Sequence, residues 1–373
     1  MLDAQDDEAR TRFRTLQNLE AAGPAANLQP EEEEEEELLL LVSEEPDSFV
    51  EAKADGSWRR AMQEEMAAIE ENSTWHLTTL PPGHRAIGLK WVYKVKKDAQ
   101  GAVLKHKARL VAKGYVQRHG VDYDEVFAPV ARLESIRLLL ALAVREGWPV
   151  HHMDVKSAFL NGELEEEVYV QQLPGFAASG KEHFVLRLRK ALYGLKQAPR
   201  AWNTKLDASL IRLGFSQCES EAGMYGRGAA GGRLLVGVYV DDLVITGSDS
   251  NDIEAFKLEM QELFQMSDLG LLTYYLGIEV HQSPAGIDIA QTAYAVKLVE
   301  KAGLAGCSPC HTPMEPRLKL SRDSTAQSVD ATEYRSLIGS LRYLVNTRPD
   351  LASSVGYVSR FMEAPTEEHQ AAV

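Results

Sequence analysis

The chain has 373 residues, of which 40 are lysine or arginine and 55 are aspartate or glutamate, so its formal net charge is −15 at pH 7. Hydrophobic residues make up 45% of the sequence and charged residues 25%, a balance that excludes a wholly disordered or collagen-like chain. The excess of acid argues at first against nucleic-acid binding, because phosphate contacts come from basic side chains.

The acid is concentrated in the first part of the chain. Residues 1–57 contain seventeen acidic and four basic residues, a net charge of −13, and seven of the acids form the unbroken run 31–37. The remaining 316 residues therefore carry a net charge of only −2. Such an acidic block repels itself and lacks apolar surface, which predicts a disordered head over residues 1–44. A tail that docks on a basic partner is the alternative.

A basic β-hairpin is predicted after an amphipathic helix over residues 58–72. Its strands are 89–96 and 103–111, joined by a turn at 98–101. The window 85–118 holds ten basic residues and one acid, and a second window, 187–212, holds seven basic residues and one acid. Each window is either a patch that binds polyphosphates or a solvated basic face.

Helices and strands mix along the rest of the chain, which predicts an α+β fold of two or three domains. The predicted helices are 133–144, 199–213, 253–264, 334–345 and 351–362, and the predicted strands are 150–155, 182–188, 234–240, 243–246, 274–280 and 286–290.

Cysteines and apolar segments indicate the compartment. Cys218, Cys307 and Cys310 are too few for a disulfide framework, which favours a reducing environment. Cys307, Cys310 and His311 resemble half of a zinc site, but no second ligand pair lies nearby, so we expect ordinary cysteines. No apolar run approaches the roughly 18 to 20 residues that span a bilayer, and no secretory signal is recognised. We therefore expect a soluble intracellular protein without membrane contact.

Two adjacent aspartates, Asp241 and Asp242, stand between two apolar strands at the tip of a predicted hairpin. Carboxylates so close together repel, and a divalent cation removes that cost. Oxygen ligands alone favour Mg²⁺ or Mn²⁺. Asp154, near the end of the predicted strand 150–155, has the right placement to complete a site for two metal ions.

Several long motifs resemble the reverse transcriptases of Copia-type retrotransposons. The resemblance begins near residue 45 and runs to the end of the chain. The motifs that carry it, in the family's order, are 107–115 (KARLVAKGY), 127–130 (FAPV), 153–162 (MDVKSAFLNG), 191–202 (ALYGLKQAPRAW), 239–242 (YVDD), 275–280 (YLGIEV) and 334–344 (YRSLIGSLRYL).

The resemblance implies a right-hand polymerase fold with fingers, palm and thumb. Residues 45–302 would form the fingers and palm, with a primer-grip hairpin at about 274–290. Residues 303–373 would form a mainly helical thumb or connection segment, and we expect the chain to stop before a ribonuclease H domain.

The resemblance also implies the site residues. Asp154, Asp241 and Asp242 would be the catalytic carboxylates and would bind two Mg²⁺ or Mn²⁺ ions together with the Val155 carbonyl. Phe159 would exclude a ribose 2′-hydroxyl, although a core aromatic is the alternative for this residue. The remaining implied nucleotide-binding residues are Lys96, Lys97, Lys107, Arg109, Val155, Lys156, Ser157, Ala158, Tyr193 and Gly194, and the implied primer grip is Leu276, Gly277 and Ile278.

The implied function is RNA-directed DNA polymerisation, in which dNTPs are added to a primer 3′-hydroxyl on an RNA or DNA template. The partners would be the template–primer duplex, dNTPs and other Pol or Gag products, in the cytoplasm, in virus-like particles or in the nucleus. A catalytically silent retroelement-derived protein that only binds nucleic acid is one alternative. A two-metal nuclease is another.

Overall fold

The computed structural model describes residues 45–373 except 98–101, 174, 178–179 and 229–232. The disorder predicted for residues 1–44 and the turn predicted at 98–101 therefore lie outside the described residues. The chain forms two compact units, of which the first combines the residues before 68 with Lys90–Val111, and the second combines Ala68–Leu89 with Ala112–Val373. No helix in the described part of the chain is long and apolar enough to span a membrane.

The first unit contains the predicted basic hairpin. Helix α3 (Phe49–Ala54) is capped by the Ser48 side chain and is followed by α4 (Gly56–Glu71), which begins in this unit. Strands β2 (Leu89–Lys97) and β3 (Val103–Ala112) form a two-stranded sheet. The Trp58 ring packs edge-on against Tyr93 at 5.3 Å and against His106 at 4.6 Å. An aromatic core of this kind gives a small two-stranded sheet the apolar face that it needs for stability.

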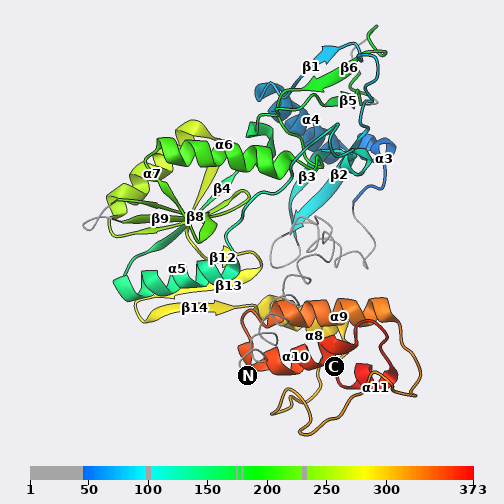
Figure 1. Ribbon diagram of the computed structural model, residues 1–373, viewed down its shortest axis with the longest axis vertical. Coiled ribbons are helices and arrows are strands. Elements are labelled where there is room, and N and C mark those ends of the chain that lie inside the picture. The colour runs from blue at the N-terminus through cyan, green and yellow to red at the C-terminus, as the bar shows by residue number, and fades with distance from the viewer. Residues whose placement is uncertain (1–44, 98–101, 174, 178–179, 229–232) are drawn as a thin grey trace, which may run out of the picture. The chain divides into compact units, whose positions relative to one another are not determined.

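A six-stranded antiparallel sheet is the centre of the second unit. Its strand order is β11-β4-β10-β9-β8-β7. The strands are β4 (Val150–Val155), β7 (Ser216–Cys218), β8 (Glu221–Arg227), β9 (Leu234–Tyr239), β10 (Asp242–Gly247) and β11 (Met266–Leu271). Helices α6 (Ala198–Arg212) and α7 (Ser250–Leu263) cover one face of this sheet, and α5 (Leu133–Glu146) covers the other (Figure 1).

The apolar spacing of α5 explains its position. Ile136, Leu139, Leu140 and Ala143 recur every three or four residues and are all buried, so they form one face of the helix. This face packs with strand residues of β4 and β10 in a single core cluster. The helix ends at Gly147, whose φ of 70° is the left-handed conformation that favours glycine at a helix C-terminus.

Two smaller sheets and a set of helices complete the second unit. One sheet has the strand order β1-β6-β5 and consists of β1 (Trp75–Thr78), β5 (Tyr169–Gln171) and β6 (Val185–Leu188). The other sheet has the strand order β12-β13-β14 and consists of β12 (Tyr274–Tyr275), β13 (Ile278–Ser283) and β14 (Gly286–Ala290). The C-terminal helices are α8 (Thr292–Lys301), α9 (Ala331–Leu344), α10 (Ala352–Val358) and α11 (Glu367–Ala371). The short 3-10 helices are η1 (Gly114–Val116), η2 (Ala158–Asn161), η3 (Pro349–Leu351) and η4 (Ser359–Phe361).

Most predicted elements are confirmed, and three differ. The strand predicted at 274–280 is interrupted by a turn at Leu276 and Gly277. The helix predicted at 351–362 consists of η3, α10 and η4 in succession, and the strand predicted at 182–188 is confined to β6. Strands β1, β5, β7, β8 and β11 were not predicted. The sequence of β11, Met-Ser-Asp-Leu-Gly-Leu, does not alternate between apolar and polar residues.

Candidate functional site

Two central strands bring the predicted aspartates to one end of the six-stranded sheet. In the register of β4 and β10, Asp154 stands directly opposite Asp242. Asp241 lies in the turn between β9 and β10, and its carbonyl accepts a 2.9 Å hydrogen bond from the Val155 N–H. Directly opposed residues of an antiparallel pair point to the same face of a sheet. The side chains of Asp154 and Asp242 therefore share one face.

The turn that carries Asp241 has an uncommon backbone. Val240 has a φ of 50°, a left-handed conformation that is unfavourable for a β-branched residue. The Val240 carbonyl accepts a 2.7 Å hydrogen bond from the indole Nε1 of Trp202, which is buried in α6. Strain of this kind persists only where the surrounding structure enforces it. The long-range bond from Trp202 therefore helps to hold the turn.

The segment after β4 forms a compact turn. Ser157 has a φ of 51°, and η2 follows it. The Lys156 N–H donates to the Gln265 carbonyl over 2.9 Å, so this amide is already engaged in the pairing of β4 with β11. Ala158 and Phe159 are buried, and the Phe159 ring lies edge-on to the Tyr193 ring at 4.9 Å.

The Tyr193–Gly194 loop is fixed by the chain that follows β3. The Ala112 N–H donates to the Tyr193 carbonyl over 2.7 Å. Gly114 approaches the same loop so closely that a Cβ atom on it would lie 1.9 Å from the Gly194 carbonyl oxygen. The buried side chain of Gln117 accepts from the Lys196 N–H over 2.8 Å. These contacts make Gly114 a residue for which no larger side chain fits.

The four basic residues predicted to bind phosphate belong to the first unit. Lys96 and Lys97 are exposed at the end of β2, and Lys107 and Arg109 are half-buried on β3. Glu65 is buried near β3 and accepts from the Leu110 N–H over 3.1 Å. Burial raises the pKa of the Glu65 carboxyl, and the charges of Arg109 and Lys107 act in the opposite direction.

The predicted primer-grip residues form a tight turn. Leu276 and Gly277 have φ values of 46° and 74° and connect Tyr275 of β12 to Ile278 of β13. Two consecutive left-handed residues are typical of a type I′ hairpin turn. The Leu276 carbonyl accepts a 2.5 Å hydrogen bond from the Tyr343 hydroxyl of α9.

Comparison with known proteins identifies the family. Residues 72–316 match the family described as Reverse transcriptase (RNA-dependent DNA polymerase). The Retrovirus-related Pol polyprotein from transposon RE1 of Arabidopsis thaliana is 40% identical over 346 residues, which is 92% of this chain. The chain belongs to the reverse transcriptases of Copia-type retrotransposons. The Pol polyprotein from transposon TNT 1-94 of Nicotiana tabacum is also 40% identical, over 84% of this chain.

This reverse transcriptase region spans about a quarter of the length of these curated relatives, since it covers 24% of each. Among solved structures, that of the foamy viral protease-reverse transcriptase dRH in complex with ds DNA matches with a TM-score of 0.40 and 12% sequence identity. The match covers 85% of this chain and 47% of that chain.

The donor set of this reverse transcriptase suits a hard divalent cation, since its members offer carboxylate oxygens. Within the described residues, however, no group of three or more His, Cys, Asp and Glu residues is arranged so that it could hold a metal ion. Mg²⁺ is usually bound by one or two carboxylates together with substrate phosphates rather than by an all-protein cage. The opposed pair Asp154 and Asp242 fits that mode of binding.

Sequence reasoning missed the polar surroundings of Asp242. The side chain of His152 has its Nε2 atom 2.7 Å from Asp242 Oδ1. Its position two residues before Asp154 was the available signal, because residues two apart on a strand share a face. Tyr275 lies on the same side of the sheet, with its ring centroid 6.3 Å from that of His152.

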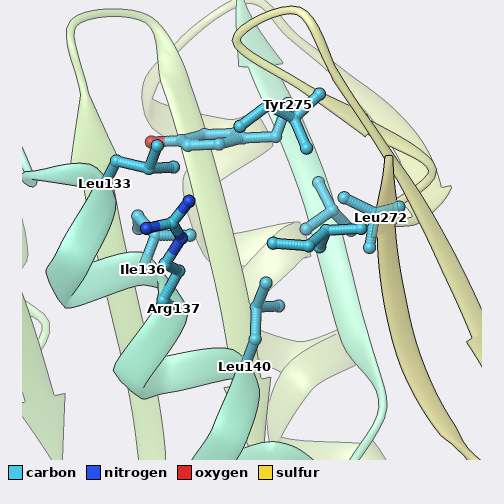
Figure 2. A pocket seen from close by; sticks show the side chains of 9 residues that line it. Leu133, Ile136, Arg137, Leu140, Leu272 and Tyr275 are labelled. Carbon is cyan, nitrogen blue, oxygen red and sulfur yellow. The ribbon is translucent and has the colours of Figure 1, made fainter. Parts of the chain in front are cut away.

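A small pocket lies beside this region, between α5 and the β12-β13-β14 sheet. Figure 2 shows Leu133, Ile136 and Arg137 of α5 pointing toward Tyr275 and Leu272. The Tyr275 hydroxyl is buried and has no hydrogen-bond partner among the described residues. Burial raises the pKa of Tyr275, and the charge of Asp242 raises it further. The pocket is lined by apolar side chains for the most part.

Proposed function

We propose that this chain catalyses RNA-directed DNA polymerisation, in which the 3′-hydroxyl of a primer attacks the α-phosphate of a dNTP and pyrophosphate leaves. The observation that carries the proposal is the register of β4 and β10, which sets Asp154 opposite Asp242 next to the Asp241 turn. Catalysis of this reaction rests on positioning and electrostatic stabilisation.

The aspartates would act as ligands of two Mg²⁺ or Mn²⁺ ions, with the Val155 carbonyl as a further donor. When bound, the ions would activate the attacking hydroxyl and stabilise the leaving pyrophosphate. The chain's own contribution is to hold Asp154 and Asp242 on neighbouring strands and to keep Asp241 in a turn braced by Trp202. These constraints fix the carboxylates before the substrate arrives.

The turn after β4 would receive the nucleotide. The amides of Ser157 and Ala158 are the phosphate donors that we retain, because the Lys156 amide is bonded to Gln265. Phe159 packs against Tyr193 and would stand beside the sugar of the dNTP, with Gly194 next to the template base. Lys96, Lys97, Lys107 and Arg109 remain proposed ligands of the β and γ phosphates.

The β12–β13 turn at Leu276, Gly277 and Ile278 would hold the primer end. We further propose that the template–primer is RNA or DNA, that other Pol or Gag products are partners and that the protein acts inside the cell. The relatives are Pol polyproteins by name, which supports this setting.

Primer extension tests the proposal. Purified chain is incubated with Mg²⁺, dNTPs and a labelled DNA primer on an RNA template, and extension is followed on a gel. We expect extension by the wild-type chain and a loss of roughly 1,000-fold or more for Asp241→Asn and Asp154→Asn, since each removes a charge that positions the reacting groups. The control variant is Asp252→Asn, which changes an exposed aspartate in the first turn of α7.

The outcomes separate the alternatives. Extension that survives in Asp241→Asn contradicts the site assignment. A gel shift of the template–primer without extension supports the silent nucleic-acid-binding alternative. Cleavage of the labelled strand without incorporation of dNTPs supports a nuclease.

A further inference from the structure

One histidine contacts a proposed catalytic aspartate from within the sheet. His152 Nε2 lies 2.7 Å from Asp242 Oδ1, and the two residues are 90 positions apart in the sequence. His152 is only 9% exposed, and 24% of the Asp242 side chain is exposed. When Asp242 is ionised, its carboxylate can only accept a hydrogen bond, and the donor is then the Nε2–H of the imidazole.

The strand register explains why these two side chains meet. Asp154 is opposite Asp242 and His152 is opposite Val244, so His152 and Asp242 are diagonal neighbours on one face of the β4–β10 pair. Diagonal neighbours lie within reach of long side chains. Asp242 therefore meets His152 on the strand that also carries Asp154.

The imidazole has a fixed environment. Val150 and Val244, the strand neighbours of His152 on this face, are fully buried in the core cluster that includes α5. The Tyr275 ring stands edge-on to the imidazole, with an interplanar angle of 74°. Because its surroundings are closely packed, His152 holds its Nε2 atom in one place, and the hydrogen bond restrains the carboxylate of Asp242.

We propose that His152 is a positioning residue for Asp242: it binds Oδ1 and thereby orients the carboxylate so that Oδ2 can serve as a ligand of the catalytic metal. This inference rests on the proposed function, because it assumes that Asp242 is a metal ligand. Polar groups that hold a metal ligand in orientation typically change metal affinity or activity by roughly 10- to 100-fold when they are removed.

Direct Mn²⁺ binding tests this role apart from turnover. Free Mn²⁺ is titrated by electron paramagnetic resonance in the presence of dNTP and a template–primer whose primer ends in a dideoxynucleotide. We expect His152→Leu to weaken Mn²⁺ binding by roughly tenfold. His152→Gln keeps an amide donor at a similar reach and should retain affinity within about threefold of wild type, whereas His152→Asn is too short and should behave as the leucine variant does.

His151→Gln is the matched control. His151 is the neighbouring residue on β4, but its side chain lies on the opposite face, where Nδ1 is 2.9 Å from the Lys257 ammonium group. This variant should alter stability and leave Mn²⁺ affinity unchanged. If His152→Leu does not fold, the comparison of His152→Gln with His152→Asn decides the question.

Unchanged Mn²⁺ affinity in both His152→Leu and His152→Asn would overturn the inference and make His152 an ordinary buried histidine. An equal loss in His151→Gln would also overturn it, because the effect would then belong to the strand as a whole. The primer-extension assay of the wild-type chain is run in parallel. If the wild-type chain extends the primer and the His152 variants bind Mn²⁺ as the wild type does, only the role of His152 is contradicted. If the His152 variants bind Mn²⁺ more weakly but the wild-type chain does not extend the primer, only the proposed polymerase activity is contradicted.

Discussion

The indole nitrogen of Trp202 donates a 2.7 Å hydrogen bond to the carbonyl of Val240, the left-handed residue beside Asp241. Trp202 lies on α6, 38 positions earlier in the chain, and is almost fully buried. The bond therefore connects a helix of the second unit to the strained turn that carries the proposed catalytic aspartate.

Replacing Trp202 with phenylalanine should weaken both stability and catalysis. The change removes the donor to Val240 and leaves a small cavity, for which we expect a loss of about 2 to 4 kcal/mol in the free energy of unfolding. The kcat of primer extension should fall because the turn is less restrained. Phe264→Leu is the control, since it disturbs the ring packed at 5.1 Å from Trp202 without removing the donor. An equal fall in kcat in both variants would assign the effect to packing alone.

Gly114→Ala should disturb the Tyr193–Gly194 loop. The added Cβ would lie 1.9 Å from a backbone carbonyl oxygen, so the loop must move, at a cost of about 1 to 3 kcal/mol or more. We expect the KM for dNTP to rise and the Kd for template–primer to stay the same. Gly339→Ala in α9 is the control: nothing lies within 4 Å of its Cβ position, and alanine should stabilise the helix by about 0.5 to 1 kcal/mol. An unchanged KM in Gly114→Ala contradicts the placement of this loop at the nucleotide.

Phe159→Val distinguishes a sugar-selecting residue from a core aromatic. If Phe159 excludes the 2′-hydroxyl, the ratio of kcat/KM for a ribonucleotide to that for a dNTP should rise by roughly tenfold or more. The control is Phe215→Val, which shortens another buried phenylalanine whose ring is 5.0 Å from that of Phe256. Both variants should lose stability. If the ratio of kcat/KM for the ribonucleotide to that for the dNTP is the same in Phe159→Val as in the wild type, Phe159 is a core residue without a role in sugar selection.

The buried Glu65 predicts a pH-dependent stability of the first unit. Burial raises the pKa of this carboxyl above its ordinary value of 4.5, so the folded state binds more protons than the unfolded state between the ordinary and the raised pKa. Stability therefore falls as pH rises through that window. Glu65→Gln, whose side-chain oxygen can still accept from Leu110, should be more stable than wild type at pH 7, and the difference should shrink as pH falls toward 4.5.

Hydrogen exchange of peptides from α4 and β3 measures this difference. Glu64→Gln is the control: this exposed residue pairs with Lys105 at 2.9 Å, and its removal should change stability by less than about 1 kcal/mol at any pH. A Glu65→Gln advantage that is the same at pH 5 and pH 7 would contradict the raised pKa.

Strands β4, β9 and β10 could be predicted from the sequence because their signals are local. The strand 150–155 was predicted with the bounds of β4, and the two aspartates between apolar runs predicted the β9–β10 hairpin. The turn at Leu276 could not be predicted in the same way, since a leucine in the left-handed conformation contradicts its own local preference. Its carbonyl bonds to Tyr343, 67 positions later, and such a contact leaves no trace in a short window.

The sequence by itself determined the family, the order of its motifs and the concentration of acid before residue 58, because motifs and charge are properties of the chain as written. The tertiary structure decided which side chains meet. In the folded chain, Asp154 lies opposite Asp242, and His152 contacts the Asp242 carboxylate. The Trp202 indole donates a hydrogen bond to the Val240 carbonyl, and the Lys156 amide donates one to the Gln265 carbonyl. Each of these contacts depends on strand register or helix packing between distant segments, and that geometry exists only after the chain has buried its apolar faces.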